Sequence, residues 1–153
     1  MEIETLRSEI KSKFPDSLVE TGFFGNGKIP YFWVSESALI DIGTYLKKHP
    51  VFELDWLENV SIADMGDSFL VSLFLRSRAS AFEGVIRISP MKKGEKSVVM
   101  IPPVHTVWSE MISYEADAYG LFGICWRSAG KKLGSSKFSW EDDQFPFRKR
   151  VHS

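Results

Sequence analysis

The amino-acid sequence predicts an α+β domain of two layers, in which helices pack on one face of a mostly antiparallel, mixed β-sheet. The chain has 153 residues, of which 44% are hydrophobic, enough for one continuous core. Apolar residues recur with the helical period in some segments and alternate in others. The expected elements run helix, two strands, helix, three strands, helix and tail. This order favours helices gathered on one side of a sheet.

The first helix is predicted by apolar residues at spacings of three and four, namely Ile3, Leu6, Ile10 and Phe14. Pro15 ends it, because the residue before a proline avoids helical backbone angles. Two aromatic and β-branched segments follow, Ser17–Phe24 and Ile29–Val34, joined by Gly25-Asn26-Gly27. Since an Asn-Gly pair supplies the positive φ angles of a tight turn, we expect a β-hairpin.

Ser35 is expected to cap a second helix that ends before Pro50. Its buried stripe and its basic end are Leu39, Ile42, Leu46, Lys47 and Lys48. We then expect Phe52–Leu57 to form a short helical turn that places Trp56 on the core. A turn at Asp64–Asp67 follows.

Three strands are expected next, at Phe69–Arg76, Phe82–Ser89 and Lys96–Ile101. A charged turn at Lys92–Lys96 separates the second from the third. Pro102-Pro103 stops the third strand, because neither proline ring can donate a ladder hydrogen bond.

The last predicted helix spans Glu110–Tyr119, with Ser109 as its cap and with Gly120 and Gly123 breaking it. Apolar and aromatic side chains surround much of its circumference: Met111, Ile112, Tyr114, Ala118 and Tyr119. Residues 1–126 are therefore assigned to the α+β domain. Residues 127–153 begin with the small polar run RSAGKKLGSSK and regain aromatic residues after it, so we expect a loop and a C-terminal docking tail.

Charge and composition exclude several classes of function. With 19 basic and 20 acidic side chains, the chain lacks the dense positive field that nucleic acids and anionic membranes require. The basic cluster at Arg148–Arg150 is expected to be solvated. One cysteine and a charged N-terminus without a signal-peptide core favour a cytoplasmic protein. No apolar run approaches the roughly 20 residues that span a bilayer, so any membrane association would pass through a partner.

Reactive groups are sparse. Cys125 and His105 could form a thiol–imidazole pair, but they flank an apolar helix and no third orienting group is indicated, so catalysis is a remote option and Cys125 is expected in the core. The three histidines lack the close spacing of a zinc site. Glu115 and Asp117 would point about 200° apart on a helix and could not share a proton. The late glycines do not follow a strand, which excludes a dinucleotide fingerprint.

The segment 104–124, VHTVWSEMISYEADAYGLFGI, combines a tryptophan, two tyrosines and a phenylalanine with carboxylates. Tyr and Trp supply much of the energy at protein interfaces, and partly buried carboxylates there need a paired donor. This composition favours docking against another protein over turnover of a substrate.

This segment resembles the signature of the C subunit, or thirty-kilodalton subunit, of NADH–quinone oxidoreductase (respiratory complex I). The resemblance rests on Trp108, on Tyr114-Glu115-Ala116-Asp117 and on Leu121-Phe122-Gly123-Ile124. Weaker likenesses lie at Tyr45–Pro50 and at Phe145-Pro146-Phe147-Arg148-Lys149. The sequence departs from the signature where Ala116 replaces an arginine, Asp117 a glutamate and Gly120 an acid. These changes together suggest a divergent member with an altered interface.

The resemblance implies a non-catalytic scaffold subunit that binds no cofactor and docks on the large hydrogenase-like subunit of a respiratory complex, near the quinone site. It places the protein in the cytoplasm or peripherally on the inner face of the membrane. The expected partner-binding residues are Trp108, Tyr114, Glu115, Asp117, Tyr119, Leu121, Phe122, Gly123, Trp140, Phe145, Pro146, Arg148 and Lys149.

Two alternatives remain open. The first is that three of these aromatic residues fill the domain's own core: Trp108, Tyr119 and Phe122. The second is a free-standing binding or homodimeric domain that kept the fold and left the complex, as the altered signature would allow.

Overall fold

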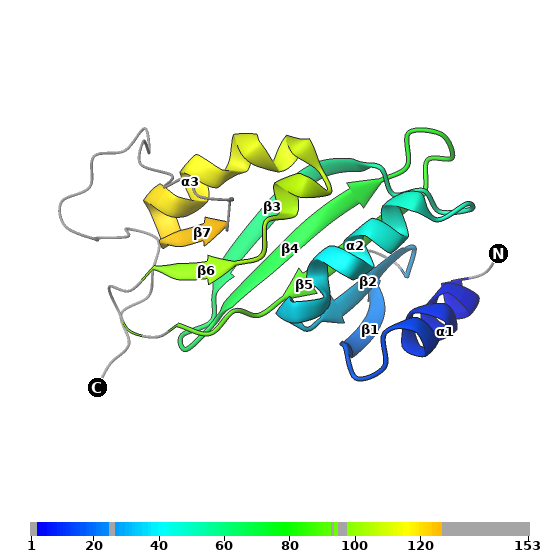
Figure 1. Cartoon of the computed structure of the whole chain (residues 1–153), viewed down its shortest axis with the longest axis horizontal. Helices are drawn as coiled ribbons and strands as arrows, with labels where there is room; N and C mark the ends of the chain where they lie inside the picture. The colour runs from blue at the N-terminus through cyan, green and yellow to red at the C-terminus, as the bar shows by residue number, and fades with distance from the viewer. Residues whose placement is uncertain (1–2, 25–26, 93, 95–97, 127–153) are drawn as a thin grey trace.

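The structure is a computed structural model that describes residues 3–24, 27–92, 94 and 98–126 (Figure 1). The helices are α1 (Ile3–Lys13), η1 (Glu36–Ala38), α2 (Leu39–Lys48), η2 (Val104–Thr106), η3 (Ser109–Met111) and α3 (Ile112–Phe122), the η elements being 3-10 turns. The strands are β1 (Leu18–Phe24), β2 (Ile29–Val34), β3 (Trp56–Asp64), β4 (Phe69–Arg76), β5 (Glu83–Ile88), β6 (Val99–Ile101) and β7 (Ile124–Trp126).

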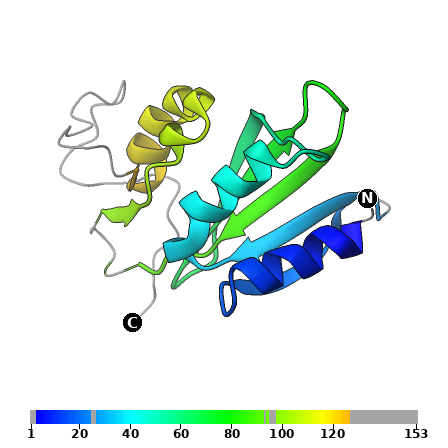
Figure 2. The ribbon, with the colours of Figure 1, turned by 45° about the vertical axis from the view of Figure 1, so that its right-hand side comes forward.

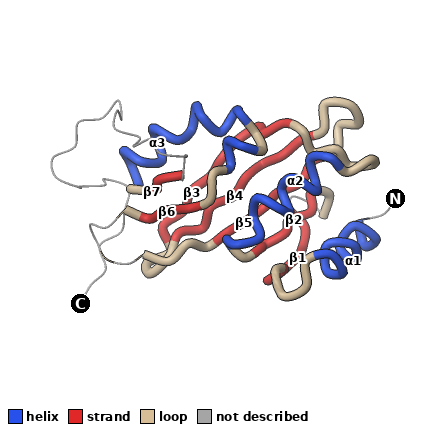
Figure 3. Tube along the Cα trace, in the orientation of Figure 1, coloured by secondary structure: helices blue, strands red, loops and turns tan. Residues whose placement is uncertain are grey.

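The main sheet has five strands in the order β1-β2-β5-β4-β3. β2 and β5 run parallel, and the other three neighbouring pairs are antiparallel. The strands are the red segments of the tube in Figure 3. The predicted α+β class with a mostly antiparallel, mixed sheet is therefore confirmed. The predicted hairpin is also confirmed, since β1 and β2 pair in register from Phe24↔Ile29 to Glu20↔Trp33.

The helices cover one face of this sheet, and the core lies between the two layers (Figures 1 and 2). In β4 every second side chain is buried toward the helices: Phe69, Val71, Leu73 and Leu75. Helix α2 buries the stripe that the sequence predicts, Leu39, Ile42 and Leu46. Helix α1 buries Leu6 and Ile10. The spacing of apolar residues thus determines which side of each element meets the core.

The expected helical turn at Phe52–Leu57 is wrong: the described residues between α2 and β3 form no helix, and Glu53 has a positive φ of 37°. Trp56 begins strand β3 and is 40% exposed, while its neighbour Leu57 is buried. Successive side chains of a strand point to opposite faces, so only one of the two can reach the core. The turn after β3 is present and includes Gly66 at φ 100°, a conformation that favours glycine.

The expected third strand also differs. Among the described residues of this range, Val99–Ile101 form a strand, β6, which pairs in parallel with β7 rather than joining the main sheet. Residues 95–97 lie outside the described part of the chain. Parallel pairing requires a crossover between the strands, and here α3 provides it.

The last helix begins and ends differently from its prediction. Ser109 does not cap it, because the chain enters through the 3-10 turn Ser109–Met111 and the Ser109 hydroxyl donates instead to Glu110 Oε2 at 3.1 Å. Gly120 lies buried inside the helix and does not break it. Gly123 does end it, in a left-handed conformation at φ 71° and ψ 31°. Ser35 likewise makes no side-chain capping hydrogen bond, although its backbone is extended as a cap requires.

Candidate functional site: the helix α3 region

Trp108 anchors the approach to α3 in the core. Its side chain is 1% exposed, and its indole N–H donates a hydrogen bond of 2.9 Å to the carbonyl oxygen of Leu54. Gly43 of α2 lies against the ring so closely that an added Cβ would be 2.9 Å from it. Trp108 therefore joins three parts of the domain: α2, η3 and the segment that precedes β3. Because its side chain is buried, it could stabilise a docking surface but could not itself contact a partner.

Tyr114 and Glu110 face the free edge of β3. The Tyr114 hydroxyl donates to the carbonyl oxygen of Glu58 at 3.0 Å, and Glu110 Oε1 accepts from the backbone N–H of Leu57 at 3.0 Å. Both bonds join the irregular start of β3 to η3 and α3. Sequence reasoning missed this role of Glu110, because only the tertiary structure brings η3 beside β3.

Glu115 and Asp117 lie on opposite sides of α3, as the helical period predicts. Glu115 is 4% exposed and Asp117 is exposed. Glu115 Oε1 lies 3.0 Å from His105 Nδ1, so this buried carboxylate has a partner within its own domain. The signature resembled by this segment has an arginine next to this glutamate, whereas this chain has Ala116.

Glu115 also influences Cys125. Burial first, and then the charge of Glu115, raise the pKa of the Cys125 thiol. A raised pKa keeps the sulfur protonated, which is the opposite of what activates a cysteine nucleophile. The structure thus brings a carboxylate to both Cys125 and His105, which sequence reasoning did not foresee, yet the arrangement does not favour thiol chemistry.

The end of α3 is half-buried. Leu121, Tyr119 and Phe122 are each partly exposed, and the Phe122 ring meets Phe69 edge-on with centroids 6.1 Å apart. Gly123 is buried. Ile112, at the start of the helix, is 61% exposed and was not among the expected residues. The exposed residues of α3 are therefore Ile112, Ser113 and Asp117.

The remaining expected contact residues lie outside the described part of the chain: Trp140, Phe145, Pro146, Arg148 and Lys149. Their role in docking stays a prediction.

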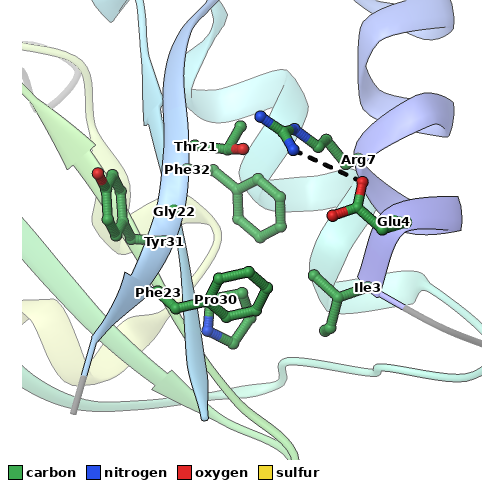
Figure 4. Close-up of a pocket in the computed structure, with 9 residues that line it drawn as sticks. All are labelled: Ile3, Glu4, Arg7, Thr21, Gly22, Phe23, Pro30, Tyr31 and Phe32. Atoms are coloured by element: carbon green, nitrogen blue, oxygen red, sulfur yellow. Dashed lines mark ion pairs between the residues drawn. The ribbon is translucent and has the colours of Figure 1, made fainter. Parts of the chain in front are cut away.

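Two open hollows of about 500 and 470 Å³ lie on the surface, the first lined by Trp56 and Arg76 among others and the second by Trp33 among others. In residues 3–126 as described, no group of three or more His, Cys, Asp or Glu side chains could hold a metal ion. A cavity beneath α1 is lined by Ile3, Arg7, Phe23 and Phe32 among others (Figure 4), but its volume is only about 10 Å³. That volume suits one water molecule. Such a water could serve Arg7 Nε, which is buried and makes no hydrogen bond within the described residues.

Comparison with known proteins adds one result. The structure is similar to a chain of the membrane-bound sulfane sulfur reductase, an archaeal respiratory membrane complex, with a TM-score of 0.70. The two chains share a fold. They are 15% identical, and the match covers 95% of this chain and 82% of the other. No protein-family model and no curated protein matches the sequence. Within the described residues, no helix is long and apolar enough to cross a membrane.

Proposed function

We propose that this protein is a non-catalytic scaffold subunit of an electron-transfer complex related to NADH–quinone oxidoreductase, docking on the large hydrogenase-like subunit near the quinone site. The observation that carries the proposal is a coincidence of two independent likenesses. The signature-like segment Trp108–Ile124 forms η3 and α3, and the fold around it is similar to that of a chain from a respiratory membrane complex.

The side chains of the segment divide into two roles. Trp108 and Glu115 hold η3 and α3 against the domain, through the bonds to Leu54 and His105. Ile112 and Asp117 remain exposed on the same helix and supply an apolar contact and a charge to a partner. Buried groups that fix a helix and exposed groups that meet a neighbour are what a docking element requires.

The pairing of Glu115 supports a modified interface. With Ala116 in place of the signature arginine, a carboxylate buried at 4% exposure would be costly without a donor, and His105 provides one at 3.0 Å. Because this chain has Ala116 there, the partner subunit would not need to accommodate an arginine side chain at position 116. This re-pairing explains how the fold could persist while the polar network of the interface changes.

Co-expression tests the proposal. The full chain would be produced with the large hydrogenase-like subunit from the same genome, and complex formation measured by co-purification and by size-exclusion chromatography with light scattering. We expect a one-to-one complex that Asp117→Arg together with Ile112→Glu weakens at least tenfold. A matched control is Asp41→Arg, an exposed acid of α2.

Two results would contradict the proposal. Wild-type chain that forms no complex with this subunit would favour the alternative of a free-standing domain. A homodimer of this chain that does not bind the large subunit would favour the homodimeric form of that alternative. In either case Ala116→Arg with Asp117→Glu, which restores two of the three altered positions of the signature, would leave association unchanged.

A further inference from the structure

The face of the main sheet that points away from the helices carries a cluster of aromatic side chains. Strand register determines its composition: Phe74 pairs with Val85, Val85 with Tyr31, and Arg87 with Trp33. Phe24 joins from β1. We call these residues the aromatic face: Phe24, Tyr31, Trp33, Phe74, Val85 and Arg87. Figure 4 shows Tyr31 and Phe32, adjacent in β2, pointing to opposite sides of the sheet.

The rings of the aromatic face pack on one another. The Phe24 centroid lies 5.2 Å from that of Tyr31 and 6.4 Å from that of Phe74. Gly22 lies directly beneath the Tyr31 ring, where an added Cβ would come within 2.7 Å of it. The glycine thus allows Tyr31 to lie flat across β1. The helices α1, α2 and α3 all lie on the other side of the sheet (Figures 1 and 2), and the aromatic residues of this face are each partly exposed.

Arg87 occupies the middle of this face. Its guanidinium carbon lies 4.1 Å from the centroid of the Phe24 ring and 4.7 Å from that of Tyr31, and its Nε donates to Ser72 Oγ at 3.3 Å. Two aromatic contacts and a hydrogen bond hold one side of the guanidinium in a defined position. Its terminal nitrogens remain available to a further acceptor.

Arg87 differs from the other described arginines in lacking a carboxylate partner. Three arginines pair with acids: Arg7 with Glu4 at 3.5 Å, Arg76 with Glu58 at 3.8 Å and Arg78 with Asp55 at 3.0 Å. Arg87 makes no such pair within residues 3–126 as described. A half-buried, pre-positioned guanidinium gains most from a carboxylate that can bond it through two oxygens.

We propose that the aromatic face is a second docking surface, and that it receives a partner protein whose apolar contact area presents one carboxylate to Arg87. The surface has the arrangement of a stable interface, with aromatic residues and one arginine at the centre. Charged residues lie around it, with Glu83 beside Arg76 and Glu20 beside Trp33. The inference rests on the proposed function, and it identifies the sheet, distinct from α3, as a surface that meets the rest of the complex.

The test uses the full chain in complex with the large hydrogenase-like subunit. Arg87→Glu should weaken the complex at least tenfold in Kd. Lys48→Glu makes the same charge change at an exposed position of α2 and should alter Kd less than twofold. Hydroxyl-radical footprinting of wild-type chain provides a readout that does not depend on variant folding. We expect Tyr31 and Trp33 to lose reactivity on complex formation and Tyr45 of α2, on the helix side of the sheet (Figure 1), to retain it.

The outcomes separate this inference from the function on which it rests. If the complex forms while the rings stay reactive and Arg87→Glu has no effect, the docking face is wrong and the scaffold function stands. If no complex forms, the scaffold function fails. Protection of the rings in the isolated monomer would mean that residues 127–153 cover them, and protection that grows with concentration would mean a second copy. Both of these results overturn the proposal.

Discussion

Two tryptophans show how strongly the environment of a single residue decides its contribution. Trp108 is 1% exposed and donates a hydrogen bond to Leu54, whereas Trp56 is 40% exposed and its ring centroid lies 5.3 Å from the guanidinium carbon of Arg78. We expect Trp108→Ala to lower the free energy of unfolding by about 3–5 kcal/mol, because it removes a large buried ring and leaves a carbonyl unpaired. Urea denaturation followed by far-UV circular dichroism would measure the change.

The matched control is Trp56→Ala, which should cost at most about 1 kcal/mol, since an exposed ring and one cation–π contact contribute little. Equal losses for the two variants would show that Trp108 is less firmly packed than its contacts indicate. The comparison also bears on function, because a residue that stabilises the domain this strongly need not touch a partner to matter for docking.

A second residue-scale feature is a polar cluster that joins α1 to α2. Glu9 Oε2 accepts from the Tyr45 hydroxyl at 2.5 Å and lies 3.0 Å from His49 Nε2. His49 Nδ1 accepts from the backbone N–H groups of Val51 and Phe52 at 3.2 and 3.3 Å, so its proton lies on the nitrogen facing Glu9. The cluster thus fixes one tautomer of a buried histidine.

This cluster makes stability depend on pH at both extremes. Hydrogen bonds from Tyr45 and then His49 lower the pKa of Glu9 from its ordinary 4.5. That stabilisation is present above the unfolded pKa and is lost as pH falls through the folded pKa. Burial and the bond to Glu9 raise the pKa of Tyr45 from 10.0 to about 12. Its contribution is present below pH 10 and is lost as pH rises toward about 12.

We therefore predict that Glu9→Gln flattens the acid side of the stability profile and that Tyr45→Phe flattens the alkaline side. Urea midpoints measured from pH 3 to 12 would show each change. Glu4→Gln is the control, since this exposed carboxylate on the same helix pairs with Arg7 and lies outside the cluster. An unchanged profile for Glu9→Gln would mean that the bonds to Tyr45 and His49 are not maintained in solution.

At the scale of elements, strand β3 shows how the fold protects a sheet edge. An edge strand presents unpaired backbone groups that invite another strand. Here Glu110 and Tyr114 reach down from η3 and α3 to bond Leu57 N–H and Glu58 C=O. The same short segment therefore shields the edge and carries the signature that suggests docking.

Glu110→Ala should expose this edge. We expect the Leu57 amide to exchange with solvent about tenfold faster, corresponding to loss of one hydrogen bond of about 1–1.4 kcal/mol. Hydrogen exchange followed by NMR would measure it. Asp117→Ala, which removes an exposed carboxylate from the neighbouring helix, should leave the Leu57 amide unchanged. A uniform acceleration across β3 and β4 would indicate global destabilisation rather than an edge effect.

Local patterns predicted the elements that carry strong periodicity. The α1 and α2 stripes and the β1–β2 hairpin follow from apolar spacing and from the Asn-Gly pair. Strand β3 escaped prediction because a register irregularity between Leu57 and Asn59 shifts its alternation, so that Leu57 and Val60, three residues apart, face the same side. β7 escaped because three residues after a helix carry too little pattern.

At the scale of the whole molecule, the candidate sites depend on contacts distant in sequence. The aromatic segment near α3 was visible in the sequence, but the division between buried Trp108 and exposed Ile112 required the packed structure. The aromatic face was not visible at all. Its residues come from four strands, and the parallel pairing of β2 with β5 brings Tyr31 beside Val85. No local rule predicts which distant strands become neighbours.

The distribution of buried apolar residues along the chain predicts which part of the sequence is needed for the domain to fold. Buried apolar residues run from Leu6 to Trp126 and form one cluster between the sheet and its helices. We expect the free energy of unfolding of a chain ending at Gly130, measured by urea denaturation, to equal that of the full chain within about 0.5 kcal/mol. Ending there keeps the new terminal carboxylate away from Trp126, which is fully buried. A loss above about 2 kcal/mol would show that residues beyond Gly130 complete the core. Unchanged stability with lost binding to the large subunit would instead assign those residues to docking.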